Sequence, residues 1–534
     1  MSLWNPPWNT VRKPTSSSNY TYELLPSSSG PEYQSTSSGG SFSHVPRASR
    51  LWWPRKVSLR HRGVILTFIV FLAACAAGIV ILVWKFSSPT RPTPTSTHDF
   101  PPPPTLPADV AGTDVTAAPP EGQARPPPLY EAYHERERHF PQHNLSLPDP
   151  EGSHAKYLWA DNHGSHFGWG NYMQEMLLNA YLAFAAHRAY VFDNYTWERE
   201  GSEISSWNGH SIPARIPLSA FLSGHIVGEH KREDDIPRAV SREYYLSVCP
   251  KSERVVIDTR TVQDTLPGDA TVHQIVDAWV EKLDQIDARC VELARSSPAL
   301  FSYDITNTNR VLDVFPALSA SPILSDFSWS PLILGEFYAN IRYFESRSDS
   351  PDDAPILTES SFAPLPGLLA VHIRRGDYET WCTDAYLHSM SFIGFNSFPE
   401  LPDKYVIPEV DKTHSTADIT RKRCLPTIPE IVEKILAVNA PHVTRLYIMT
   451  NAKREWLAEL KDALREKHEW VDGMGTSRDL ELSWEGRFVS EAVDMYVGQR
   501  AERFIGNGFS SMTSNVVTLR MHNPALSPSD THFW

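Results

Sequence analysis

Two arginines follow a short apolar run in the C-terminal half of the chain. The run 368–373 is rich in β-branched residues and predicts a buried strand. Arg374, Arg375 and Asp377 come next, and Gly376 lets the backbone turn. Ligands lie beyond the carboxyl ends of parallel strands, and Arg suits phosphate oxygens, so the pattern predicts a site for a phosphorylated ligand. The alternative is a surface salt bridge at a strand end.

Two further segments offer backbone N–H groups to an anion. Ser510 and Ser511 follow the turn 506–508 and open a predicted helix, where hydroxyls and unpaired N–H groups can hold phosphate. A Gly-rich loop, 164–171, precedes another predicted helix, 173–184. Ordinary helix capping and an ordinary turn are the alternatives at these two places.

The elements that must position these residues alternate between strand and helix. The N-terminal unit is predicted as strand 156–159, helix 173–184 and strand 188–192, with helical pieces such as 271–295 further on. The C-terminal unit is predicted as strand 368–373, helix 428–438, strand 445–449, helix 453–465, a helix from 490, strand 503–505 and a helix from 510. This order predicts an α/β fold with parallel sheets, in domains spanning 150–355 and 356–534.

The N-terminal quarter of the chain predicts a membrane anchor. Residues 1–46 have the composition of a disordered tail, within a cytosolic segment ending at 62. The uncharged run 63–84 is long enough for a transmembrane helix, with a signal peptide as the competing interpretation. Basic residues gather before the run, which predicts a cytosolic N-terminus. A Pro-rich stem, 85–149, is expected to follow.

Charge and cysteine content fit a non-cytosolic location for the rest of the chain. The whole chain carries a formal charge of −14, which does not suit nucleic-acid binding. Of four cysteines beyond the membrane run, we favour the pairs Cys249–Cys290 and Cys382–Cys424, which are local in sequence, although free thiols remain an alternative. No Cys or His spacing suggests a metal site.

Three segments, taken in order, resemble the GDP-fucose-dependent fucosyltransferases, particularly the protein O-fucosyltransferase group. They are Gly168-Trp-Gly-Asn171 with its helix, His372-Ile-Arg374-Arg375-Gly-Asp377, and the stretch that runs from Asp494-Met-Tyr through Phe504-Ile-Gly-Asn507 to Ser510-Ser511. The resemblance implies a GT-B-like architecture, with two Rossmann-like domains and a donor site in the cleft between them. It also implies metal-independent, inverting transfer of fucose from GDP-fucose to a hydroxyl of a protein or glycan, with no cofactor beyond the donor.

The resemblance also implies roles for single residues. Arg374 would neutralise charge on the departing GDP, a form of transition-state stabilisation. Ser510 and Ser511 would bind phosphate oxygens, while His372, Arg375 and Asp377 would shape the site. Asp494 would hold the guanine or ribose, and the loop with Gly168 and Gly170 would close over the donor and face the acceptor.

The general base is the least defined part of this expected site. Asn171 is a candidate catalytic residue by its place in the loop, but its amide cannot accept a proton as a base. Glu175, one helical turn later, is the candidate base, although such helix residues more often cap or face solvent. The stretch from 380 to about 425 looks longer than in the animal enzymes and is a candidate for acceptor selection.

Other functions remain open at the level of sequence. The chain could use another GDP-sugar, or act as a non-catalytic scaffold or chaperone of the secretory pathway. A structural cell-surface protein on a stalk would explain the stem but not the arginines. The long stem, and the ending Thr-His-Phe-Trp in place of a retention signal, favour a single-pass type II protein of the Golgi lumen over the endoplasmic reticulum.

Overall fold

The folded part of the chain begins earlier than the sequence predicts. The computed structural model describes residues 130–534, apart from 208–209, 230–235, 346–361 and 408–413. The expected stem was to reach residue 149, yet α2 (Glu131–Arg138) is already helical. Tyr130 is fully buried and its hydroxyl donates to the Glu485 carbonyl over 2.8 Å. Tertiary contacts of this kind anchor the segment, and the Glu, Ala and Arg residues of α2 favour a helix.

The predicted membrane run, 63–84, and the expected tail lie outside the described residues. Within the described ranges, no helix is both long enough and apolar enough to cross a membrane. The anchor therefore stays a prediction.

A five-stranded parallel sheet forms the core of the N-terminal half, with the strand order β8-β2-β1-β10-β9. Its strands are β1 (Tyr157–Ala160), β2 (Ala189–Phe192), β8 (Val240–Ser241), β9 (Arg254–Ile257) and β10 (Cys290–Leu293). The expected strands 156–159 and 188–192 are confirmed as β1 and β2. The chain places β2 and β8 on one side of β1, crosses to the far edge of the sheet at β9, and then adds β10 between β9 and β1.

A second five-stranded parallel sheet forms the core of the C-terminal half, with the strand order β14-β13-β12-β15-β16. Its strands are β12 (Leu365–Ile373), β13 (Arg445–Thr450), β14 (Gly473–Thr476), β15 (Ala501–Gly506) and β16 (Thr531–Phe533). Numbered along the chain, this order is 3-2-1-4-5, as in doubly wound nucleotide-binding sheets. The point of reversal lies between β12 and β15.

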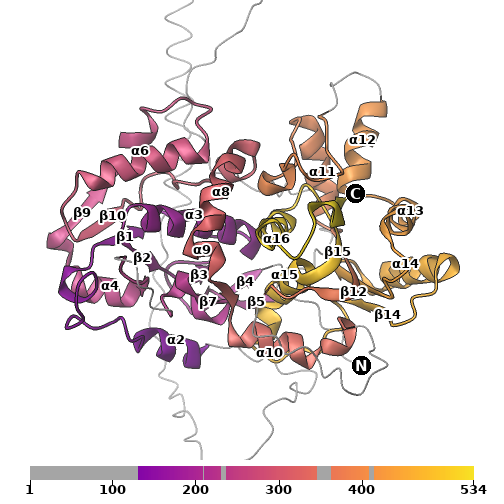
Figure 1. Ribbon diagram of the computed structural model, residues 1–534, viewed down its shortest axis with the longest axis horizontal. Coiled ribbons are helices and arrows are strands. Elements are labelled where there is room, and N and C mark those ends of the chain that lie inside the picture. Colours follow the sequence, from indigo (N-terminus) through magenta and orange to yellow (C-terminus); the bar gives the residue numbers. More distant parts are fainter. Residues whose placement is uncertain (1–129, 208–209, 230–235, 346–361, 408–413) are drawn as a thin grey trace, which may run out of the picture. The chain divides into compact units, whose positions relative to one another are not determined.

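Helices cover both faces of the second sheet. Side chains of β12 alternate between two cores because successive residues point to opposite faces. Leu369, Val371 and Ile373 pack with α13 (Ile428–Val438) and α14 (Arg454–Lys467). Leu368 and Ala370 join the larger core with α15 (Ser490–Arg500) and α16 (Ser511–His522). Figure 1 shows these two helix pairs on opposite sides of the sheet.

The remaining elements connect and flank the two sheets. The other helices are α3 (Trp169–Ala185), α4 (Arg242–Val248), α5 (Arg260–Gln263), α6 (Val272–Asp284), α7 (Tyr303–Thr306), α8 (Phe315–Ala320), α9 (Pro322–Ser325), α10 (Pro331–Ala339), α11 (Tyr378–Leu387) and α12 (His414–Cys424). Three short antiparallel pairs join β3 (Tyr195–Thr196) to β6 (Arg215–Ile216), β4 (Ile204–Trp207) to β5 (His210–Pro213), and β7 (Leu222–Gly224) to β11 (Phe327–Trp329).

One secondary-structure prediction is wrong over part of its length. The stretch 271–295 was expected to be helical, but the helix α6 ends at Asp284 and the strand β10 begins at Cys290. Val291 and Leu293 are fully buried between neighbouring parallel strands, and a short apolar run in a parallel sheet has no periodicity that separates it from a buried helix.

Both favoured cysteine pairs are confirmed as disulfides. Cys249 and Cys290 link α4 to the N-terminal sheet, and Cys382 and Cys424 link α11 to the end of α12. The second disulfide therefore joins the first and last helices of the stretch that looked like an insertion.

The starts of two helices, one from each half of the chain, lie against each other. Asn515 of α16 donates a hydrogen bond of 2.7 Å to the carbonyl of Gly170 in α3. Gln174, one turn further along α3, donates to the hydroxyl of Ser514 over 3.1 Å. The helix α3 begins at Trp169, earlier than predicted, so Gly170 and Asn171 belong to its first turn.

Candidate functional site

The reversal point of the second sheet brings together residues from two of the predicted segments. Arg374 follows β12 directly, and the turn from Asn507 to Ser510 follows β15, its neighbour in the sheet. Open α/β sheets bind ligands beyond the carboxyl ends of the strands at this point. The observed order of the strands therefore places a candidate ligand site between Arg374 and the start of α16.

The Arg374 guanidinium is held by a carboxylate and an aromatic ring. Its Nη2 donates to the Asp377 carboxylate over 2.6 Å, and its centre lies 4.6 Å from the centroid of the Tyr378 ring. Burial lowers the pKa of Arg374, but Asp377, Tyr378 and Glu491 outweigh burial and raise it, so the group stays charged. In the described part of the chain, the buried Nε has no hydrogen-bond partner. The site thus has a fixed positive charge, and the Nε–H of Arg374 is available to donate a hydrogen bond.

Tyr378 links Arg374 to the start of α16. Its hydroxyl donates to the carbonyl of Phe509 over 3.0 Å, directly before Ser510. Burial raises the pKa of Tyr378 to about 12, while Arg374 and the Ser510 hydroxyl lower it. This contact links Arg374 and Asp377 to the start of α16 through a tyrosine that the sequence analysis did not select, and the use of these residues as one ligand site stays a prediction.

The turn after β12 is clamped by Asn451, which follows β13. The side-chain oxygen of Asn451 accepts a hydrogen bond of 2.7 Å from the backbone N–H of Arg375. Its amide nitrogen donates to the Arg375 carbonyl over 2.8 Å and to Asp377 over 3.0 Å. Gly376 lies between these contacts with φ of 67°, a conformation that suits glycine.

Arg375 is held by two backbone carbonyls and an aromatic ring. Its guanidinium donates to the carbonyls of Arg374 and Pro426 and lies 4.2 Å from the centroid of the Trp456 ring. Burial lowers its pKa to about 10. These contacts give Arg375 a structural function in this conformation, and its predicted contact with substrate stays a prediction.

His372 lies inside the fold with 2% of its surface exposed. Its Nδ1 lies 2.7 Å from the Thr513 hydroxyl of α16, and burial together with the charge of Arg374 lowers its pKa to about 3. The ring is therefore neutral at physiological pH and braces β12 against α16. Its influence on the shape of the site would act through this contact and stays a prediction.

The two loop glycines differ in their surroundings. A Cβ atom on Gly170 would lie 2.8 Å from the backbone nitrogen of Met512 and 2.9 Å from the Ser511 hydroxyl, so glycine is required where α3 meets α16. A Cβ atom on Gly168 would meet no atom within 4 Å. Ser511 is half-buried at this junction, and Asn171 is partly exposed in the first turn of α3.

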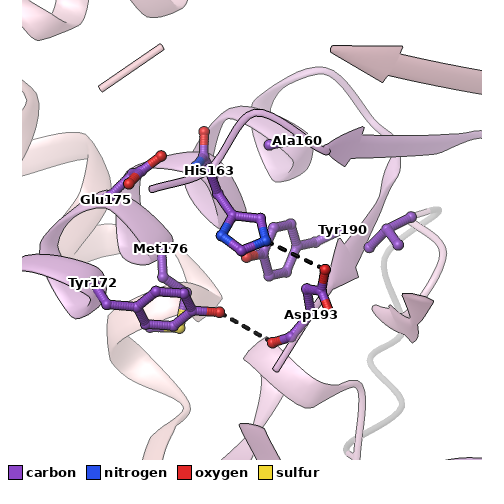
Figure 2. A pocket seen from close by; sticks show the side chains of 9 residues that line it. Ala160, His163, Tyr172, Glu175, Met176, Tyr190 and Asp193 are labelled. Carbon is purple, nitrogen blue, oxygen red and sulfur yellow. Dashed lines mark hydrogen bonds and ion pairs between the residues drawn. The ribbon is translucent and has the colours of Figure 1, made fainter. Parts of the chain in front are cut away.

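Glu175 lies beneath the loop that precedes α3 (Figure 2). It is 5% exposed, and its carboxylate accepts a hydrogen bond of 3.0 Å from the backbone N–H of Gly164. Burial raises its pKa, although His163 and this hydrogen bond oppose the shift. Beside it lies a cavity of about 10 Å³, room for about one water molecule. Glu175 can serve as a base only if this loop moves.

Asp494 lies at a third place in the C-terminal half, on α15. Its two oxygens accept hydrogen bonds of 2.7 Å from the hydroxyls of Tyr447 and Ser477. Burial raises its pKa to about 7, against these two hydrogen bonds. Ser477 follows β14, so Asp494 lies near the carboxyl edge of the same sheet, and its predicted contact with guanine or ribose stays a prediction.

Three functional candidates were missed by sequence reasoning. Tyr378 and Asn451 were available to it, since each follows a strand end by a few residues. Glu491, in the first turn of α15, influences the pKa values of Arg374, Tyr378 and Tyr195, which indicates a carboxylate near the site from a helix that carried no motif at that position. Among the described residues, no group of three or more His, Cys, Asp or Glu side chains is arranged to hold a metal ion.

Residues 358–523 match the family described as GDP-fucose protein O-fucosyltransferase. The match contains Arg374, Asp377, Asp494, Ser510 and Ser511, and it confirms the resemblance expected from the sequence for this segment. Comparison with curated protein sequences finds no match.

Solved structures of fucosyltransferases are similar to the chain at low identity. POFUT1 in complex with GDP-fucose is 14% identical with a TM-score of 0.43, covering 72% of this chain and 99% of that chain. NodZ α-1,6-fucosyltransferase soaked with GDP-fucose is 13% identical with a TM-score of 0.31, covering 68% and 92%. A mutant of Arabidopsis thaliana FUT1 in complex with GDP is 11% identical with a TM-score of 0.31, covering 74% and 73%.

Proposed function

We propose that the chain is a glycosyltransferase that moves fucose from GDP-fucose to a hydroxyl of a protein or glycan acceptor. The observation that carries this proposal is the position of Arg374. It ends β12 at the reversal point of a Rossmann-ordered sheet, inside the segment that matches the GDP-fucose protein O-fucosyltransferase family. The finer architecture that we propose is GT-B-like, with two Rossmann-like domains and a cleft between them.

The residues around Arg374 suggest how the donor would be held. A departing GDP gains negative charge on its β-phosphate, and a fixed guanidinium stabilises this charge most when it is oriented before the reaction. Asp377 and Tyr378 provide that orientation. The N–H groups at the start of α16, next to Ser510 and Ser511, offer further donors to phosphate oxygens. We therefore propose that these protein groups neutralise the charge on the departing GDP, and that the transfer is inverting and metal-independent.

The acceptor hydroxyl must lose a proton during an inverting attack. Glu175 stays our candidate base, because burial raises its pKa toward the range in which a carboxylate accepts protons efficiently. For Glu175 to act as the base, the loop that contains Gly164 must open, because the Gly164 N–H binds its carboxylate. Asn171, partly exposed at the junction of α3 and α16, would orient the acceptor by hydrogen bonding.

The membrane topology and the cellular location are proposals that rest on sequence alone. We place the catalytic part on the lumenal side of a single-pass type II membrane protein, in the Golgi, because basic residues precede the apolar run 63–84 and a Pro-rich stretch follows it. The two disulfides support an oxidising compartment.

Release of GDP from donor sugars tests the activity. We expect the purified full-length chain to release GDP from GDP-fucose faster than from GDP-mannose when a mixture of glycoproteins and oligosaccharides is supplied. Faster release from GDP-mannose would reassign the donor. Binding of GDP without release from either donor would instead favour a scaffold that retains the nucleotide site.

A further inference from the structure

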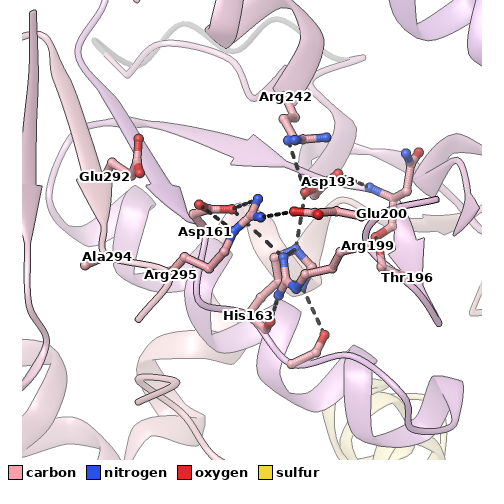
Figure 3. A network of polar contacts seen from close by, with 12 residues as sticks. Asp161, His163, Asp193, Thr196, Arg199, Glu200, Arg242, Glu292, Ala294 and Arg295 are labelled. Carbon is pink, nitrogen blue, oxygen red and sulfur yellow. Dashed lines mark hydrogen bonds and ion pairs between the residues drawn. The ribbon is translucent and has the colours of Figure 1, made fainter. Parts of the chain in front are cut away.

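Charged residues end the strands of the N-terminal sheet as well. Asp161 follows β1, Asp193 follows β2, Arg242 follows β8, and Arg295 lies two residues beyond β10. Because these strands are parallel, all four residues lie at one edge of the sheet. Figure 3 shows them joined by His163, Arg199 and Glu200 into a continuous set of polar contacts, which we call the edge network.

Two carboxylates of the edge network, Asp161 and Asp193, are largely buried and pair with more exposed arginines, whereas Glu200 is exposed. The Asp161 side chain is 8% exposed, whereas that of Arg295 is 44% exposed. Two hydrogen bonds of 3.0 and 3.1 Å connect them in a bidentate pair. Asp193 is similarly buried and lies 3.6 Å from the Nε of Arg242, whose side chain is 35% exposed. The carboxylates thus fix guanidinium groups that remain in contact with solvent.

Fold stability alone explains this arrangement poorly. A buried carboxylate loses its hydration, and its attraction to a guanidinium that stays in water recovers only part of that loss. Oriented, solvent-facing donors are instead what a polar ligand needs, because side chains fixed before binding lose less entropy when they bind.

The edge network lies where a parallel sheet binds its ligand. The strands β1 and β10 are parallel neighbours, and Asp161 and Arg295 lie just beyond their carboxyl ends, on the side where open α/β sheets bind ligands. The loop after β1 leads within eight residues to Gly168 and then to Gly170, which packs against Ser511. A ligand on the network would therefore lie one short loop away from the proposed donor site.

The charges of the edge network point to a neutral ligand rather than an anion. Asp161, Asp193 and Glu200 offset Arg199, Arg242 and Arg295, so a phosphate or carboxylate would meet as much repulsion as attraction. A hydroxyl both donates and accepts, so it can use the carboxylates and the guanidinium groups at once. Ligands rich in hydroxyl groups match this surface best.

Two aromatic side chains flank the same loops. His166 is exposed in the loop after β1, and its ring lies 6.2 Å from that of Trp197, which is half-buried two residues before Arg199. Arg199 is itself tied to this loop through a hydrogen bond to the His163 carbonyl. An aromatic ring beside oriented polar groups suits a sugar, which has an apolar face and a rim of hydroxyls.

We propose that the edge network binds the acceptor and that this acceptor is a neutral carbohydrate, with Arg295, Asp161 and Arg199 contacting its hydroxyls. This inference rests on the transferase activity proposed above. It adds the chemical class of the second substrate and the residues that recognise it. An unglycosylated protein segment is the competing acceptor, and the experiment separates the two.

Arg295→Ala removes the most exposed guanidinium of the edge network. Arg260→Ala is the matched control. Arg260 also pairs with an aspartate after a strand of this sheet, Asp258 after β9, but lies outside the edge network. We expect transfer of fucose to neutral oligosaccharides, and an acceptor KM raised about tenfold or more in Arg295→Ala. Arg260→Ala should match the wild type, and both variants should bind GDP as the wild type does.

Saturation-transfer NMR with methyl glycosides of galactose, glucose, mannose and N-acetylglucosamine provides a readout independent of turnover. Signal in the wild type that is lost in Arg295→Ala and kept in Arg260→Ala supports the proposal. Arg295→Lys, which keeps the charge, guards against misfolding and should show an intermediate acceptor KM. Transfer confined to unglycosylated proteins, or an unchanged acceptor KM in Arg295→Ala, would overturn it. Failure of the wild type to bind GDP would instead reject the transferase activity and this inference with it.

Discussion

Asn451 donates a hydrogen bond of 3.0 Å to Asp377, the carboxylate that receives the guanidinium of Arg374. Asn451 also binds both the N–H and the carbonyl of Arg375, so one side chain fixes the backbone and the carboxylate that orient Arg374. The position of the arginine is thus set from the neighbouring strand, β13.

Replacing Asn451 should therefore impair the reaction, although Asn451 itself does not contact the donor in this proposal. Asn451→Ala removes three hydrogen bonds, and we expect a loss of transition-state stabilisation of about 1–3 kcal/mol. The effect should appear in kcat more than in KM, because a misoriented arginine still attracts the donor. Asn439→Ala, a half-buried asparagine at the end of α13, is the control. Equal kinetics in the two variants would show that Arg374 does not depend on Asn451.

The two loop glycines provide a matched pair for the helix junction. In Gly170→Ala the new methyl group meets the backbone of Met512 and should destabilise the fold by about 1–3 kcal/mol. Gly168→Ala adds the same atom in open space at a φ of −63° and should change stability little. Urea denaturation of both variants checks this difference. Similar midpoints would mean that the start of α3 can shift away from α16 without cost.

Asp494 predicts a pH dependence of stability. Its pKa is about 7 in the folded state but near its ordinary value when unfolded, so the folded state holds an extra proton between these limits. Stability contributed by the protonated group is therefore lost as pH rises toward 7. Asp494→Asn cannot ionise, and we expect its stability relative to the wild type to increase by about 2–3 kcal/mol from pH 5 to pH 8.

Chemical denaturation at several pH values measures this difference. Asp462→Asn, on the exposed face of α14, should show a constant difference from the wild type over the same range. A pH-independent difference for Asp494→Asn as well would mean that the Asp494 carboxyl is already ionised at pH 5.

Removing each disulfide in turn distinguishes an effect on stability from an effect on ligand binding. The two disulfides close loops of nearly equal sequence separation, 41 and 42 residues. Replacing either pair by serine should cost about 2–4 kcal/mol of stability. Only loss of Cys382–Cys424 should also weaken GDP binding, because the Cys424 carbonyl accepts a hydrogen bond of 2.7 Å from Asn507 in the turn before α16. Equal GDP affinities in the two double variants would show that this turn is not part of the donor site.

Sequence reasoning located β12, β13 and β15 of the C-terminal half because local signals coincide there, but it did not identify β14 or β16. The run before Arg374 is short, apolar and β-branched, and the turn before Ser510 has two glycines. Proximity of Arg374 to Ser510 followed only from the rule on carboxyl ends of strands, and the structure gives the actual link, Tyr378. Asn451 follows a strand end and could have been selected on that ground, but its function in orienting the site depends on tertiary contacts that the sequence does not show.

The N-terminal half was harder to predict for the same reason. The strand β10 has only four residues and follows α6 closely, and it is distinguished as a strand by its pairing with β1 and β9. Glu175 lies on the predicted helix, but its position beneath Gly164 depends on how the preceding loop folds back. The edge network joins residues more than one hundred positions apart, such as Asp161 and Arg295, which no spacing rule connects.

Calorimetric titration of the full-length chain with GDP tests the donor site most directly. Arg374→Ala is the variant, and Arg465→Ala, an exposed arginine on α14, is the control. We predict that the wild type and the control bind GDP with the same affinity, and that Arg374→Ala binds at least about tenfold more weakly because a charged hydrogen bond to phosphate is lost. Undiminished binding by a folded Arg374→Ala protein would contradict the assignment of the donor site to the end of β12.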